Sequence, residues 1–157
     1  MKRPSLIGFD FDGTIADSIL HCYRAMCGVF NDSHIAPPAL RDYVRDFHLG
    51  GAKDFYAKRG VKGDVSWVGE TFNKYFRAHV EAKPITLFPD TIGTFERLTG
   101  LQVGFGIVSS QSQGVVNECL SRDWKSMGNS IRFLCTDVPN KATTLREVRT
   151  ALGMDGL

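Results

Sequence analysis

The sequence predicts an α/β fold in which a parallel sheet is flanked by helices and a helical subdomain is inserted between its first two strands. Short apolar runs at residues 6–11, 102–109 and 130–137 are typical of buried strands. A helical pattern follows the second and the third run, and this alternation favours parallel pairing. Residues 17–83 contain no strand pattern and are too many for one crossover, which indicates a separate helical insert.

The first predicted strand leads directly into the helical insert. Stretches rich in turn-forming residues, such as HLGG and RGVKGD, divide the insert. The predicted helices are residues 18–30, 38–47, 51–58 and 65–82. The aromatic residues expected in the core of the insert are Trp67, Phe72, Tyr75 and Phe76. A further helix, residues 91–98, leads into the second strand.

The second and third strands each lead into a helix. Ser110, followed three residues later by Gln113, fits a capping box at the start of the first of these helices. In the last helix, Gly153 is the expected stop. The apolar residues that share one face of the last helix are Leu145, Val148, Ala151 and Leu152. Gly104 and Gly106 in the second strand indicate close packing against a neighbouring element.

Composition and charge narrow the function classes. The chain has 157 residues, is 43% hydrophobic and carries a formal net charge of +2. This balance is typical of a globular protein and gives no sign of nucleic-acid or membrane binding. The four cysteines lack the CxxC spacing of a zinc or redox site, so we expect free thiols and a reducing, cytoplasmic compartment.

An acidic pair ends the first strand. Asp10 and Asp12 are two residues apart, so in extended backbone both carboxylates point to the same side. Ligands of parallel sheets bind at the carboxyl ends of the strands, and Gly13 lets the backbone turn sharply there. The plain alternative is an acidic turn. Two like charges in proximity cost free energy, however, unless a cation or a reaction uses them.

Motifs along the chain resemble those of the haloacid dehalogenase-like hydrolases, most closely the phosphoglycolate phosphatase type. DFDGTIADS resembles the first motif, VGFGIVSSQS the second and VPNKATTLREV the third. By this resemblance Ser109 corresponds to the Ser or Thr that ends the strand of the second motif, and Lys141 corresponds to the lysine of the third. LFPDTIGTFERL resembles the return from cap to core. The resemblance implies a Rossmann-like core, residues 1–16 and 84–157, and a helical cap, residues 17–83.

What the resemblance implies chemically is a phosphate monoester hydrolase acting on a small phosphorylated metabolite. Asp10 would attack phosphorus to give an aspartyl-phosphate, and Asp12 would serve as acid and then base. Mg²⁺ would be held by the Asp10 carboxylate and the Asp12 carbonyl. The residues expected to bind the phosphate are Gly13, Thr14, Ser109, Ser110 and Lys141, together with the backbone N–H groups that open the next helix.

The second acid also selects among reactions. Relatives that cleave carbon–halogen bonds lack Asp12, because a halide leaves without a proton, so DFDGT favours phosphoryl transfer. A sugar-phosphate mutase shares the pair and stays an alternative. Asp17 and Ser18 are expected either at a hinge to the cap or, for Ser18, as the cap of the next helix.

The family's fourth motif, which supplies further acidic metal ligands, has no counterpart before residue 157, and we assign Asp155 no such role. We therefore expect weakened metal affinity and an incomplete sheet with the first strand at an open apolar edge, which invites pairing with another copy. The chain is then either a fragment of a longer enzyme or a truncated form. A non-catalytic phosphate-binding or interaction module is the alternative function.

Overall fold

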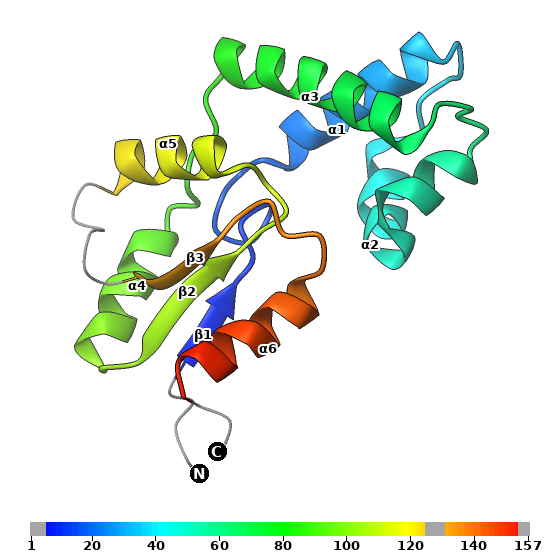
Figure 1. Cartoon of the computed structure of the whole chain (residues 1–157). Helices are drawn as coiled ribbons and strands as arrows, with labels where there is room; N and C mark the ends of the chain where they lie inside the picture. The colour runs from blue at the N-terminus through cyan, green and yellow to red at the C-terminus, as the bar shows by residue number, and fades with distance from the viewer. Residues whose placement is uncertain (1–5, 125–130, 154–157) are drawn as a thin grey trace. The chain divides into compact units, whose positions relative to one another are not determined.

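The computed structural model describes residues 6–124 and 131–153, with backbone alone for residues 47–53. The chain divides into two compact units. One comprises Met1–Ser18 and Ile85–Leu157, and the other comprises Ile19–Pro84. Each unit has its own hydrophobic core, and Figure 1 labels the helices and strands of both.

The first unit is built on a parallel sheet. Strands β1 (Leu6–Phe9), β2 (Gly104–Val108) and β3 (Ile131–Cys135) lie in the order β1-β2-β3, with both pairs parallel. Helix α4 (Thr91–Gly100) precedes β2, α5 (Gln113–Asp123) follows it and α6 (Lys141–Ala151) follows β3. This arrangement confirms the predicted α/β fold and all three predicted strands, although each strand is shorter than its apolar run.

The two faces of the sheet are packed differently. On one face, Phe9 and Phe105 contact Phe95 of α4, and Phe95 and Phe105 also pack on Trp124 beyond α5. On the other face, the Phe133 ring covers Gly106 so closely that a Cβ there would lie 2.5 Å from it. The predicted close packing is thus confirmed at Gly106.

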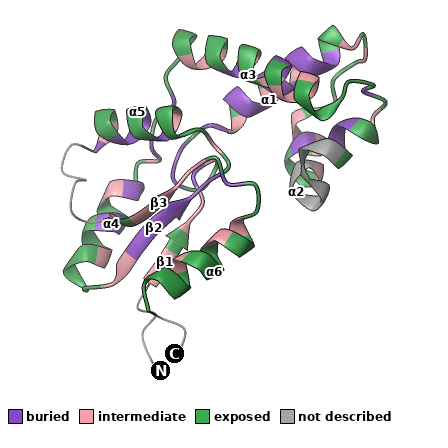
Figure 2. Cartoon of the chain, viewed as in Figure 1, coloured by how far each residue is buried: buried purple, intermediate pink, exposed green. Residues whose placement is uncertain are grey.

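Strand β1 forms one edge of the sheet in the described part of the chain, as predicted. Helix α6, which follows β3, contains no buried residue in the described structure; Leu145 of the helix is 41% exposed, and Leu152, the residue just after it, is 45% exposed. Figure 2 shows this helix as largely exposed, whereas β2 is mostly buried. Pairing of the β1 edge with another chain stays a prediction.

The second unit consists of three helices, α1 (Ile19–Asp32), α2 (Leu40–Ala57) and α3 (Val65–Ala82). An aromatic cluster of α1 and α2 forms much of its core, with Phe30, Tyr43, Phe55 and Tyr56 all buried and in ring contact. Of the aromatic residues predicted in the α3 core, only Phe76 is buried. Trp67, Phe72 and Tyr75 are half-buried on the same helix.

Helix α2 corrects one prediction. The sequence predicts two helices, residues 38–47 and 51–58, with a break at HLGG, but the helix is continuous from Leu40 to Ala57. Each glycine in a helix interior costs only about 1 kcal/mol relative to alanine. The buried residues Tyr43, Phe55 and Tyr56 lie on both sides of Gly50 and Gly51, and their packing outweighs that local cost.

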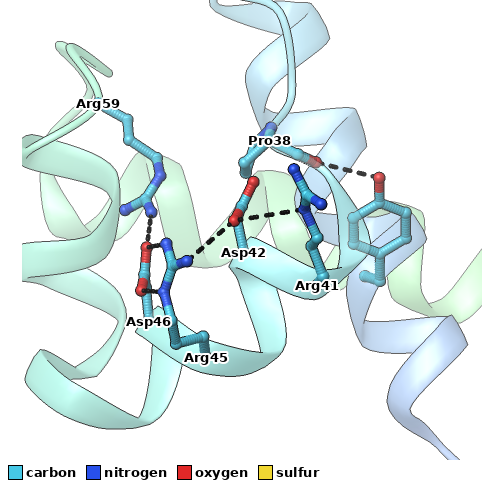
Figure 3. Close-up of polar contacts among 7 residues, drawn as sticks. Pro38, Arg41, Asp42, Arg45, Asp46 and Arg59 are labelled. Carbon is cyan, nitrogen blue, oxygen red and sulfur yellow. Dashed lines mark hydrogen bonds and ion pairs between the residues drawn. The ribbon is translucent and has the colours of Figure 1, made fainter.

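Ion pairs fix the surface of α2 (Figure 3). Asp42 pairs with Arg41 and Arg45, and Asp46 lies between Arg45 and Arg59. Hydrogen bonding from Arg45 and Arg59 holds the pKa of Asp46 down, at about 2. The Arg41 and Arg45 side chains are largely solvated, so these ion pairs form a charged helical surface.

None of the described helices is both long enough and apolar enough to span a membrane.

Candidate active site

The acidic pair lies in a tight turn at the carboxyl end of β1. Phe11, between the two acids, is fully buried, and its carbonyl accepts the N–H groups of Thr14, Ile15 and Ala16 at 3.3, 3.1 and 3.0 Å. Gly13 has a φ of +72°, a left-handed conformation that glycine adopts without strain, and its N–H donates to the Ala16 carbonyl. The turn therefore fixes the backbone that carries both carboxylates.

Asp10 is bound by groups from two distant parts of the chain. Its Oδ1 accepts the N–H of Phe11 at 2.7 Å and lies 2.6 Å from Lys141 Nζ. The two side chains remain 35% and 41% exposed, so solvent and a ligand can reach them. The predicted nucleophile and the predicted cation are thus brought together although 131 positions separate them.

Helix α6 sets the position of Lys141, its first residue. Asn140 caps the helix, with its side-chain oxygen accepting the N–H of Thr143 at 3.1 Å. This cap fixes where the helix begins and so places Lys141 beside the end of β1.

Asp12 is held differently from Asp10. The Ser18 hydroxyl, which is fully buried, donates to Asp12 Oδ1 at 2.6 Å. Burial raises the pKa of Asp12 and the negative charge of Asp10 adds to this, while hydrogen bonds from Ser18 and Gln111 and the charge of Lys141 act in the opposite direction. A carboxyl that retains its proton at higher pH than usual suits a general acid.

Ser109 ends β2 as a fully buried residue. Its Oγ accepts the N–H of Gln111 at 3.0 Å, its own N–H donates to the Cys135 carbonyl at 2.9 Å, and its carbonyl accepts the N–H of Val138 at 3.0 Å. Ser109 therefore joins the loop after β2 to the loop after β3. Its hydroxyl serves the backbone of its own loop in this structure.

The start of α5 overturns the predicted capping box. The helix begins at Gln113, one residue after Ser112, and Ser110 lies outside it in the loop. The N–H of Gln113 donates to Asp137 Oδ2 at 3.2 Å and the N–H of Ser112 donates to Gln111 Oε1 at 3.0 Å. Side-chain oxygens thus already occupy these N–H groups, where the sequence predicts phosphate binding.

The remaining predicted site residues, Gly13, Thr14 and Ser110, are exposed around this edge. Sequence reasoning did not identify Gln111 or Asp137, and it considered Ser18 only as a hinge or a helix cap. Two signals were available in the sequence: the length of the loop after β2, and Asp137, the acidic residue that ends the third predicted strand. Asp155 lies outside the described residues.

The carboxylate and carbonyl oxygen atoms at the end of β1 are of the ligand type that Mg²⁺ prefers. The described residues contain no group of three or more His, Cys, Asp or Glu side chains able to hold a metal. Mg²⁺, however, commonly binds through one or two carboxylates and completes its shell with water and substrate phosphate. The accessible Asp10 carboxylate, with the Asp12 carbonyl two residues away, is a donor set of this type.

Comparison with known proteins gives a consistent result. The family model described as haloacid dehalogenase-like hydrolase matches residues 7–151, which is nearly the whole chain. No curated protein sequence matches the chain significantly.

Solved structures share the fold at low sequence identity. A haloacid dehalogenase-like family hydrolase from Streptococcus pneumoniae superimposes with a TM-score of 0.77 at 18% identity, covering 96% of this chain and 71% of that protein. A Lactobacillus plantarum protein assigned as a phosphoglycolate phosphatase gives 0.76 at 18%, covering 98% and 73%. CbbY from Rhodobacter sphaeroides, in complex with xylulose-1,5-bisphosphate, gives 0.71 at 17%, covering 96% and 73%.

Proposed function

The chain belongs to the haloacid dehalogenase-like hydrolase family, and we propose that it is a phosphatase that hydrolyses the phosphate monoester of a small metabolite through an aspartyl-phosphate on Asp10. The observation that carries the proposal is the arrangement of three groups: Asp10 beside Lys141, with Asp12 two residues away and partly buried. Phosphatase chemistry needs a nucleophile, a cation for the phosphoryl oxygens and a proton donor, and these side chains supply them.

In the first step an oxygen of Asp10 attacks phosphorus, and the bond from phosphorus to the ester oxygen breaks. Asp12 gives its proton to the departing oxygen, so the alcohol leaves neutral. The ammonium of Lys141, now 2.6 Å from Asp10 Oδ1, stabilises the negative charge that the phosphoryl group brings to that place. Elevation of the Asp12 pKa by burial favours the protonated form that this step requires.

In the second step Asp12, now ionised, takes a proton from a water molecule as that water attacks phosphorus. The bond between phosphorus and Asp10 breaks, inorganic phosphate leaves, and both carboxyls return to their starting states. The same carboxyl therefore acts once as acid and once as base, which fits a group with opposing influences on its pKa.

We propose Mg²⁺ as the metal cofactor, held by the Asp10 carboxylate and the Asp12 carbonyl. When bound, it would neutralise the repulsion between the nucleophile and the phosphate and polarise a phosphoryl oxygen. The few protein ligands available suggest that affinity depends on substrate phosphate and water.

The substrate class is proposed from the site and from the neighbours. A lysine and an exposed turn suit one phosphate group, and a CbbY structure contains a sugar bisphosphate. We propose that the substrate is a small phosphorylated metabolite and that the helical unit is the cap that selects it.

The free cysteines fit the reducing compartment expected from the sequence.

The test is turnover of an aryl phosphate and of a panel of phosphorylated metabolites with Mg²⁺. We expect phosphate release, loss of release in Asp10→Asn, and a phosphorylated peptide containing Asp10 after acid quenching. Asp90→Asn, at an exposed residue whose side chain makes no cap bond, is the matched control. An inactive protein across the panel, or an active Asp10→Asn variant, would show that the proposed function is wrong.

A further inference from the structure

The Asp12 carboxyl has partners from two separate loops. Ser18 contacts it from the chain after the turn, with the hydroxyl 2.6 Å from Oδ1. Gln111 contacts it from the loop between β2 and α5, through its side chain. A carboxyl bonded by one donor can still turn about its terminal torsion, which has a broad energy profile. A second donor restricts that rotation.

The loop itself fixes the Gln111 side chain. The backbone N–H of Gln111 donates to Ser109 Oγ at 3.0 Å, and the Gln111 carbonyl accepts the N–H of Asp137 at 2.9 Å. Its side-chain Oε1 accepts the N–H of Ser112 at 3.0 Å. Because the amide oxygen is taken by Ser112, the NH₂ end is the part of the amide available to the Asp12 carboxylate.

Ser18 is fixed with comparable rigidity. It is fully buried, and its N–H donates to the Ala16 carbonyl at 3.0 Å. Asp17, the residue before it, donates its N–H to the Thr86 carbonyl at 2.8 Å. The hydroxyl thus lies on backbone that is hydrogen-bonded at Asp17 and at Ser18 itself, and turning it toward bulk water would break its bond to Asp12.

We propose that Gln111 and Ser18 are positioning residues for proton transfer, which together hold the Asp12 carboxyl in the orientation from which it serves the leaving group. This inference rests on the proposed phosphatase function. Both residues contact the Asp12 carboxyl and not the substrate's phosphoryl group in the proposed mechanism. Their effect passes through Asp12, since small displacements of a catalytic group reduce rates strongly.

The leaving group distinguishes this role from a general structural one. An alkyl phosphate releases a strongly basic alkoxide, which needs the proton from Asp12, whereas an aryl phosphate with an acidic phenol needs little protonation. A misplaced acid should therefore reduce kcat/KM for the alkyl ester and spare the aryl ester. A distorted nucleophile or phosphate site would reduce both.

The experiment compares kcat/KM for glycerol phosphate and for p-nitrophenyl phosphate, both with Mg²⁺. A hydrogen bond to a charged group is worth enough to predict a fall of about 10-fold to 100-fold for glycerol phosphate in Gln111→Ala and Ser18→Ala. We expect a much smaller fall for the aryl ester. Gln111→Glu, which replaces the donor by an acceptor, should match or exceed the loss in Gln111→Ala, and Ser18→Thr should restore activity.

Controls and contrary outcomes are specific. Asn117→Ala, at an exposed position further along α5, should leave both kcat/KM values unchanged. Equal losses on the two esters, or a Gln111→Glu variant as active as the natural chain, would overturn the positioning role while leaving the phosphatase proposal in place. No turnover of either ester by the natural chain would overturn the proposed function and this inference with it.

Discussion

Lys141→Ala separates catalysis from stability. The Lys141 and Asp10 side chains are 41% and 35% exposed, so solvent screens their ion pair, and such pairs stabilise proteins by about 1 kcal/mol at most. Lys141 is also the first residue of α6, where a positive charge opposes the helix dipole by about 0.3–1 kcal/mol. The two contributions are of similar size and opposite sign, so the free energy of unfolding should change little.

The expected effect on turnover is much larger. Loss of one charge-stabilising group typically reduces kcat by about 10²–10³-fold. We therefore expect phosphate release to fall by that factor, while the midpoint of thermal unfolding shifts by less than about 4 °C. Steady-state assays with Mg²⁺ and differential scanning calorimetry measure the two quantities. Arg146→Ala, which removes an exposed positive charge from the same helix, is the control. Retained activity, or unfolding at a much lower temperature, would refute this reasoning.

Three further predictions follow from burial. Asp12→Asn should raise the unfolding temperature at neutral pH, because a carboxyl whose pKa is raised in the folded chain loses its contribution to stability as pH rises through that pKa. The gain should vanish below about pH 4, where the Asp12 carboxyl is neutral in both the folded and the unfolded chain. Gly106→Ala should destabilise by about 1–3 kcal/mol in urea titrations, because its Cβ would lie 2.5 Å from the Phe133 ring, and an unchanged midpoint would contradict that packing. Cys119, whose pKa burial raises to about 11, should resist iodoacetamide at pH 8 until urea unfolds the chain, as mass spectrometry would detect.

The sequence predicted the sheet and the pairing of site groups because both depend on strong local signals. Each strand is a short apolar run, and parallel order places the ends of all strands at one edge. Asp10 and Lys141 each lie just beyond a strand or at the start of a helix, so the fold alone brings them within 2.6 Å. Their catalytic roles stay predictions.

Contacts between loops could not be predicted from local sequence patterns. The capping box expected at Ser110 and Gln113 is wrong because Asp137, 24 positions away, supplies the acceptor for the Gln113 N–H. Gln111 meets Asp12 only after β1 and β2 have paired. The break expected at HLGG is wrong for a related reason, since packing on both sides of the glycines keeps α2 continuous. In each case tertiary structure supplied a partner or a packing energy that no local pattern contains.

Phe11 explains how two acids can be kept side by side at the end of a strand. Holding like charges together costs free energy, and burial of Asp12 adds to that cost. Phe11 is fully buried between them, and burial of such a side chain contributes about 1.5–3 kcal/mol. Its carbonyl also accepts the N–H groups that close the turn. Because Phe11 lies between the two acids, its burial anchors the backbone segment that carries both carboxylates. The apolar residue between the acids therefore anchors the turn and offsets part of the free energy that holding the two charges together costs.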